Sequence, residues 1–203
     1  MYIREYMHTD VITVSGDTLL GDAQKLMTKH KIRRLPVLDK KKRLVGLLTE
    51  GRIRETTKHP GVHLNVLDFL ALLATLKVKD VMETDVVTVT PDTTVEEAVA
   101  IGQRHQIGTL PVVEGDQLVG ITTTTDIYKI TVQALGFGKP GVRLHIFGTG
   151  TRPIGEITNI IASKGIGIRS LFHLTQTASG RDDCIIHLDT EDATAIANEL
   201  KSR

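Results

Sequence analysis

The chain has 203 residues, with 25 Lys and Arg against 24 Asp and Glu, so its net charge is +1. A charge this close to zero argues against nucleic acid or an anionic membrane as the partner. The single cysteine, Cys184, excludes an intramolecular disulfide. Because no secretory signal is visible and no apolar run reaches the roughly 18 residues of a membrane span, we expect a cytoplasmic protein.

The first two-thirds of the sequence contains the same pattern twice. The matching pairs are 7–14 with 82–89, 35–37 with 110–112, and 44–47 with 118–121. A duplicated unit of this size usually packs against its copy about a pseudo-two-fold axis. Differences between the copies then indicate where function lies.

Each copy is predicted to fold in the order β-α-β-β-α. In the second copy Thr94 and Glu97 form the capping box that begins a helix. Polar turns between apolar runs indicate hairpins. The expected elements are strands at 11–14 and 86–89, helices after 17 and 94, strands at 35–38 and 110–113, returning strands at 44–48 and 118–122, and second helices from about 52 and 126.

These motifs resemble the CBS domain, and two of them in tandem resemble a Bateman module. The resemblance is carried by the D-V-x-T-V strand, the L-P-V strand and the segment from Gly120 to Asp126, in fixed order over about residues 1–135. It implies CBS repeats at 1–58 and 80–137, packed as a pseudo-two-fold pair. The linker at 59–79 contains an apolar helix, which either packs on the module's own core or forms a dimer contact.

The segment from Thr123 to Asp126 leads from a strand into a helix. N–H groups at a helix N-terminus attract anions, and an ionised carboxylate accepts hydrogen bonds from a ribose diol. The resemblance implies an adenosine compound between the repeats, with Asp126 on the ribose, Thr123 and Thr124 beside it, and the backbone at Ile12 against the adenine. The alternative is simple helix capping, since Thr and Asp favour that position.

The two copies differ at the residues that would carry this chemistry. Arg52 stands in the first copy where Asp126 stands in the second, and a guanidinium cannot accept a hydrogen bond. Arg33 and Arg34 precede the first L-P-V strand, and the resemblance implies that they meet phosphate; the alternative is a solvated basic strand edge. A possible second, weaker site contains the remaining cleft residues, namely Val87, Thr109, Thr49 and Arg52.

The last third, residues 138–203, is predicted to contain a strand at 142–147, a helix from 154, a hairpin at 166–175 and 184–188, and a final helix at 191–201. This β-α-β-β-α order resembles the ACT domain, a ferredoxin-like amino-acid-sensing fold, here without its last strand. The whole chain resembles the AcuB-type acetoin-utilisation proteins. Pro153 is followed by Ile154 rather than the Gly typical of an ACT effector turn, so amino-acid sensing is doubtful. We expect Cys184 in the core and a homodimer that covers the open edge of the first strand.

The fold class is therefore α/β (α+β). Without a phosphate loop, a metal-spaced Cys/His cluster or a Ser/His/Asp motif, we expect no enzyme, no metal and no cofactor. The leading hypothesis is a non-catalytic sensor that binds AMP, ADP or ATP between its repeats and transmits this to the ACT-like domain or to a regulated partner of unknown identity. The alternatives are a structural or partner-binding module with a degenerate cleft, or a binder of S-adenosylmethionine.

Overall fold

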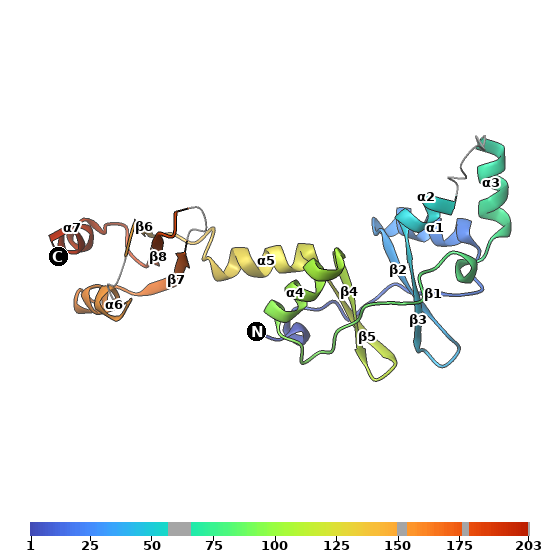
Figure 1. Ribbon diagram of the computed structural model, residues 1–203, viewed down its shortest axis with the longest axis horizontal. Helices are drawn as coiled ribbons and strands as arrows, with labels where there is room; N and C mark the ends of the chain where they lie inside the picture. Colours follow the sequence, from blue (N-terminus) through green and yellow to red (C-terminus); the bar gives the residue numbers. More distant parts are fainter. Residues whose placement is uncertain (57–65, 150–153, 176–178, 203) are drawn as a thin grey trace. The chain divides into compact units, whose positions relative to one another are not determined.

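The computed structural model describes residues 1–56, 66–149, 154–175 and 179–202 (Figure 1). They form two compact units, Met1–Ile127 and Tyr128–Arg203. The predicted chain break at 59–61 and the first part of the predicted linker, residues 59–65, lie outside the described residues. Mixed helices and strands of the predicted α/β class are confirmed in both units.

The first repeat contains β1 (Val14–Ser15), α1 (Leu20–His30), β2 (Arg34–Leu38), β3 (Leu44–Thr49) and α2 (Glu50–Thr56). The sheet order is β1-β2-β3, with β1 parallel to β2 and β2 antiparallel to β3. Helix α3 (Val66–Thr75) packs on α1 and contributes Leu73 to the apolar core under this sheet. The predicted packing of this helix on the module's own core is confirmed for that residue.

The second repeat contains α4 (Val95–His105), β4 (Thr109–Glu114), β5 (Gln117–Thr123) and α5 (Thr124–Ala134). Thr94 is the N-cap of α4, and its side chain accepts a hydrogen bond from the backbone N–H of Glu97 at 3.1 Å. The predicted hairpins of both repeats are confirmed by the antiparallel pairs β2–β3 and β4–β5.

The two early strands were predicted too long. Only Val14–Ser15 forms a strand in the first copy, and the second copy has a single bridge between Val89 and Val112. The physical reason is that the preceding backbone pairs with the sister repeat instead, through bridges from His8 to Ile121 and from Glu83 to Leu47. These crossed bridges hold the two repeats together.

The second helices begin two residues earlier than predicted. α2 begins at Glu50 and α5 at Thr124. The side-chain oxygen of Thr49 accepts a hydrogen bond from the backbone N–H of Arg52 at 3.1 Å and so caps α2. At the start of α5 the carboxylate of Asp126 accepts a hydrogen bond from the backbone N–H of Thr123 at 2.9 Å, which is a helix-capping contact of the kind that the sequence left open for this segment.

The second unit contains β6 (Val142–Ile146), α6 (Ile154–Ser163), β7 (Ile168–Thr175), β8 (Asp182–Leu188) and α7 (Thr194–Ser202). The sheet order is β6-β8-β7, so among the described residues β6 has a free edge. Cys184 is fully buried in the core between the sheet and the two helices, as predicted.

Helix α5 contains residues of both units, since it begins at Thr124 and ends at Ala134. The carbonyl of Leu135, just after its end, accepts hydrogen bonds from Arg143 at 2.9 Å and from Ser170 at 3.1 Å. The end of α5 is thereby fixed to β6 and β7. Among the described helices, none is long and apolar enough to cross a membrane.

Candidate functional site

A cavity of about 460 Å³ lies between the two repeats of the first unit. Its apolar wall consists of Leu47, Val86, Val87 and Ile107, and its hydroxyl groups come from Thr49, Thr109 and Thr124. This volume lies within the usual range of small-molecule sites, about 300–1,000 Å³. Charged and hydroxyl-bearing side chains outnumber the apolar ones in its lining, so the site is more polar than such sites usually are. Both repeats contribute to the wall, so a ligand here contacts both at once.

Arg33 and Arg34 line this cavity at the start of β2. Burial, and then the neighbouring charge of Arg33, lowers the pKa of Arg34 below its ordinary value. Within the described part of the chain, neither guanidinium has an ion pair or a side-chain hydrogen bond. Two adjacent cations without partners, one of them half-buried, favour an anionic group of a ligand.

The guanidinium of Arg34 lies close to a glycine of the other repeat, Gly108. A Cβ atom at Gly108 would lie 3.9 Å from Nη2 of Arg34 and 3.4 Å from Oγ1 of Thr124. Gly108 aligns with Arg33 of the first copy. The absent side chain leaves the space in which Arg34 lies against the second repeat.

Three carboxylates also line the cavity. Glu50 pairs with Arg54, which also lines the cavity, at 3.2 Å between Oε1 and Nη2. Glu83 and Asp85 are exposed and, in the described ranges, their side chains have no ion pair. The backbone of Glu83 is fixed to Leu47 by two hydrogen bonds of 2.8 and 3.0 Å.

Sequence reasoning missed Glu83 and Asp85 as cavity residues. A signal for Glu83 was present, because Glu83 aligns with His8 in the duplicated pattern, a change from a basic to an acidic side chain. Comparison of the two copies at every charged position, rather than only around the family motifs, could have found it.

Asp126 lies apart from this cavity. Its carboxylate accepts hydrogen bonds from the backbone N–H and the hydroxyl of Thr123, at 2.9 and 2.7 Å, and meets Nε2 of His8 at 2.9 Å. The side chain is buried, with 5% of the residue's surface exposed. Burial raises the pKa of Asp126, but the hydrogen bonds from Thr123 and His8 outweigh it, and the net effect is a lowered pKa.

Only some of the predicted site residues line this cavity. The cavity brings together Arg33, Arg34 and Thr124 of the favoured site with Val87, Thr109 and Thr49 of the weaker one. Its lining does not include Ile12, Thr123, Asp126 or Arg52. Ile12 packs against the core of the first repeat, and the Arg52 side chain pairs with Glu55 at 3.4 Å.

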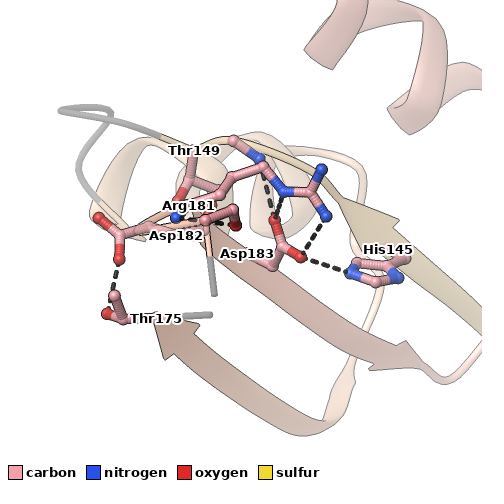
Figure 2. Close-up of polar contacts among 8 residues, drawn as sticks. His145, Thr149, Thr175, Arg181, Asp182 and Asp183 are labelled. Carbon is pink, nitrogen blue, oxygen red and sulfur yellow. Dashed lines mark hydrogen bonds and ion pairs between the residues drawn. The ribbon is translucent and has the colours of Figure 1, made fainter. Parts of the chain in front are cut away.

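A second polar cluster lies in the C-terminal unit around Asp183, which is buried with 1% exposed surface (Figure 2). Arg181 binds both its oxygens, from Nε at 2.8 Å and from Nη2 at 3.0 Å, and the N–H of Gly148 donates to it at 3.1 Å. His145 approaches at 3.3 Å. The hydrogen bond from Arg181 is the largest cause that lowers the pKa of Asp183 to about 2. The cluster joins the start of β8 to β6 and is explained by structure alone.

Among the described residues, no group of three or more His, Cys, Asp or Glu side chains could hold a metal ion. The cavity between the repeats is therefore the candidate functional site.

Two similar repeats joined by crossed bridges and sharing one cavity define a duplicated module with a candidate site between its halves. The family model of the CBS domain matches residues 3–58 and 78–132, so the chain belongs to the CBS-domain family. The tandem CBS pair inferred from the repeated motifs is confirmed. The C-terminal unit lies outside the matched residues.

The chain is similar to inosine-5′-monophosphate dehydrogenase of Methanocaldococcus jannaschii, with 35% identity over 126 residues, 62% of this chain. The match spans only 22% of that enzyme. It is also similar to the structure of an acetoin utilization protein (AcuB) of Vibrio cholerae, with 29% identity and a TM-score of 0.55, over 69% of this chain and 98% of that one. The CBS pair of MJ0100, solved with 5′-methylthioadenosine and S-adenosyl-L-methionine, shares the fold at 24% identity and a TM-score of 0.52, over 66% and 97% of the two chains.

Proposed function

We propose that this protein is a non-catalytic sensor that binds an adenosine compound in the cavity between its CBS repeats. The observation that carries the proposal is a pair of cations, Arg33 and Arg34, that have no partner among the described residues and lie in a cavity of about 460 Å³ with apolar groups in its wall. The apolar wall suits a purine base, and the arginines suit a phosphate or carboxylate. The adenosine ligands of the MJ0100 pair support this choice of ligand class.

The threonines of the cavity would serve the sugar. Thr124 Oγ1 and Nη2 of Arg34 both lie within 4 Å of the Cβ position at Gly108, and Thr109 lines the same cavity. A hydroxyl both donates and accepts hydrogen bonds, so it can bind a ribose hydroxyl in either role. The proposed ligand therefore touches both repeats, and its binding alters their relative packing energy.

Titration with adenosine, AMP, ADP, ATP and S-adenosylmethionine tests the proposal. A ligand at 100 times its Kd stabilises the protein by about 2.7 kcal/mol, which thermal unfolding detects. The Arg34→Ala variant should lose about tenfold or more in affinity for AMP or ATP and much less for adenosine. Arg104→Ala, on α4 and outside the cavity, is the matched control. Absence of stabilisation by all five compounds would favour the alternative, a structural or partner-binding module.

Transmission to the C-terminal unit forms the second part of the proposal. α5 begins beside Thr124 of the cavity, and its far end is fixed to β6 and β7 through the carbonyl of Leu135. A helix is stiff over this length, so a shift of its first turn is passed to its last. The β-α-β-β-α order of the C-terminal unit supports its ACT-like character.

The homodimer expected from the sequence stays a prediction. The free edge of β6 supports it, because an exposed strand edge can pair with another chain. Light scattering of the purified protein tests it, and a monomer at all concentrations would contradict it.

A further inference from the structure

The cavity between the repeats contains unpaired charges of both signs. Arg33 and Arg34 provide the positive charge, while Glu83 and Asp85 provide the negative charge. Glu50 and Arg54 also line the cavity but neutralise each other in an ion pair of 3.2 Å. Within the described ranges, the other four side chains have no such partner. The site is close to neutral overall, and among the described residues its two arginines, Arg33 and Arg34, do not pair with Glu83 or Asp85.

A purely anionic ligand does not fit this arrangement well. Its phosphates would gain from Arg33 and Arg34 and would be repelled by Glu83 and Asp85 in the same cavity. The acidic segment cannot move away easily, because Glu83 exchanges two backbone hydrogen bonds with Leu47 of the other repeat. The fitting ligand has a negative group and a positive centre.

The two halves of the duplicated module carry opposite charges at equivalent positions. In the half that contains Asp126, the residue of the crossed bridge is basic, His8, and the residue at the start of the helix is acidic, Asp126. In the other half the bridge residue is acidic, Glu83, which lines the cavity, and the helix residue is Arg52, which lies outside the cavity lining and pairs with Glu55. The signs of the charges at these two positions are thus reversed between the halves. The carboxylate of Glu83 is the part of the cavity wall that would stabilise a positive charge.

We infer that the adenosine ligand of this cavity carries a positive centre held near Glu83 and Asp85, with its anionic group on Arg33 and Arg34. This inference rests on the proposed function. The positive centre has two possible sources, a sulfonium on the ligand itself or a divalent cation bound to its phosphates. Both place a positive charge beside the two carboxylates.

Calorimetric titration with two matched pairs of ligands tests the inference. S-adenosylmethionine and S-adenosylhomocysteine differ by one methyl group and the positive sulfonium, and ATP can be compared with and without Mg²⁺. In the wild-type protein, either S-adenosylmethionine should bind about tenfold tighter than S-adenosylhomocysteine, or ATP with Mg²⁺ should bind about tenfold tighter than ATP alone. The pair that shows the difference identifies the source of the charge.

The double variant Glu83→Gln, Asp85→Asn should reduce this ratio to about threefold or less. Asp10→Asn is the matched control, because Asp10 occupies the position of Asp85 in the first repeat and does not line the cavity. If adenosine ligands bind but both ratios are near one, or survive the double variant, the inference is overturned and the proposed function stands. If no adenosine ligand binds, both are overturned.

Discussion

His8 and Asp126 lie 118 positions apart in the sequence, and Nε2 of the histidine is 2.9 Å from Oδ1 of the carboxylate. Thr123 binds the other oxygen through both its N–H and its hydroxyl. The carboxylate that the family resemblance assigns to the ribose is therefore already engaged on both oxygens. A ribose would have to displace His8 before it could bind there.

Replacement of Asp126 by alanine should therefore act on stability more than on ligand binding. Loss of the helix-capping contact and of the bonds to His8 should lower the free energy of unfolding by about 1–2 kcal/mol. Affinity for the proposed adenosine ligand should change by about threefold or less. Urea unfolding and calorimetry measure the two effects, with Asp10→Ala as the control. A tenfold loss of affinity at unchanged stability would show instead that the ribose binds Asp126.

The space at Gly108 predicts a size-dependent effect on binding. The three nearest atoms to a Cβ there lie at 3.4, 3.5 and 3.9 Å, which are ordinary van der Waals contacts. Gly108→Ala should therefore fold normally and bind ligand within about twofold of the wild type. Gly108→Leu should displace the Arg34 guanidinium and weaken binding of phosphate-bearing ligands by about tenfold.

Calorimetry with AMP and with adenosine distinguishes these outcomes for the two variants at Gly108. The loss in Gly108→Leu should be larger for AMP, since the displaced group is the cation that meets the phosphate. Equal losses for both compounds would show that the leucine blocks the cavity as a whole. Unchanged binding in Gly108→Leu would show that Arg34 does not contact the ligand.

The fold could be predicted from sequence because its signals are local and occur twice. Apolar runs with turns between them gave β2–β3 and β4–β5, and Thr94 marked the start of α4. The early strands were overestimated because apolar alternation at 11–14 and 86–89 does not reveal which backbone it pairs with. The crossed bridges of His8 and Glu83 to the sister repeat are long-range contacts that no local pattern encodes.

The residues of the candidate site could be predicted from the sequence only in part. Arg33, Arg34 and Thr124 could be predicted as cavity residues because they stand in motifs of fixed spacing. The contact between His8 and Asp126 joins the N-terminal segment to α5 and depends on the packing of the repeats. Glu83 and Asp85 required the same knowledge, since a carboxylate after an irregular turn is an ordinary surface residue until the cavity is seen.

The cluster around Asp183 predicts a specific dependence of stability on acid. Its pKa is lowered from 3.8 to about 2, so the charged form stabilises the folded protein above pH 3.8. That stability is lost as the pH falls to about 2, where the folded protein also binds the proton. Asp183→Asn should lower the thermal midpoint of the C-terminal unit at pH 7, because Arg181 and the N–H of Gly148 lose a charged partner.

The difference in thermal midpoint between wild type and Asp183→Asn should shrink between about pH 4 and about pH 2. Thermal unfolding followed by circular dichroism over this range measures it. Asp182→Asn is a neighbouring control, since Asp182 accepts a hydrogen bond from Thr175 at an exposed position. A difference that stays constant down to pH 2 would mean that the charge of Asp183 contributes nothing to stability.

The stiffness of α5 predicts that binding and transmission can be separated. Lys129 and Gln133 are exposed on this helix, between the cavity residue Thr124 and the anchored carbonyl of Leu135. Replacement of both by glycine costs about 1 kcal/mol of helix stability at each position, whereas alanine at both keeps the helix. Ligand affinity should stay within about twofold in both variants.

The two α5 variants should differ in the response of the C-terminal unit to ligand. Hydrogen exchange at the amides of β6, β7 and β8 should change on ligand binding in the wild type and in the alanine variant, because the helix passes on the movement of its first turn. In the glycine variant this change should disappear, since the helix frays between its two fixed ends. An equal response in the glycine variant would rule out α5 as the route, and no response in the wild type would restrict the sensor to its CBS repeats.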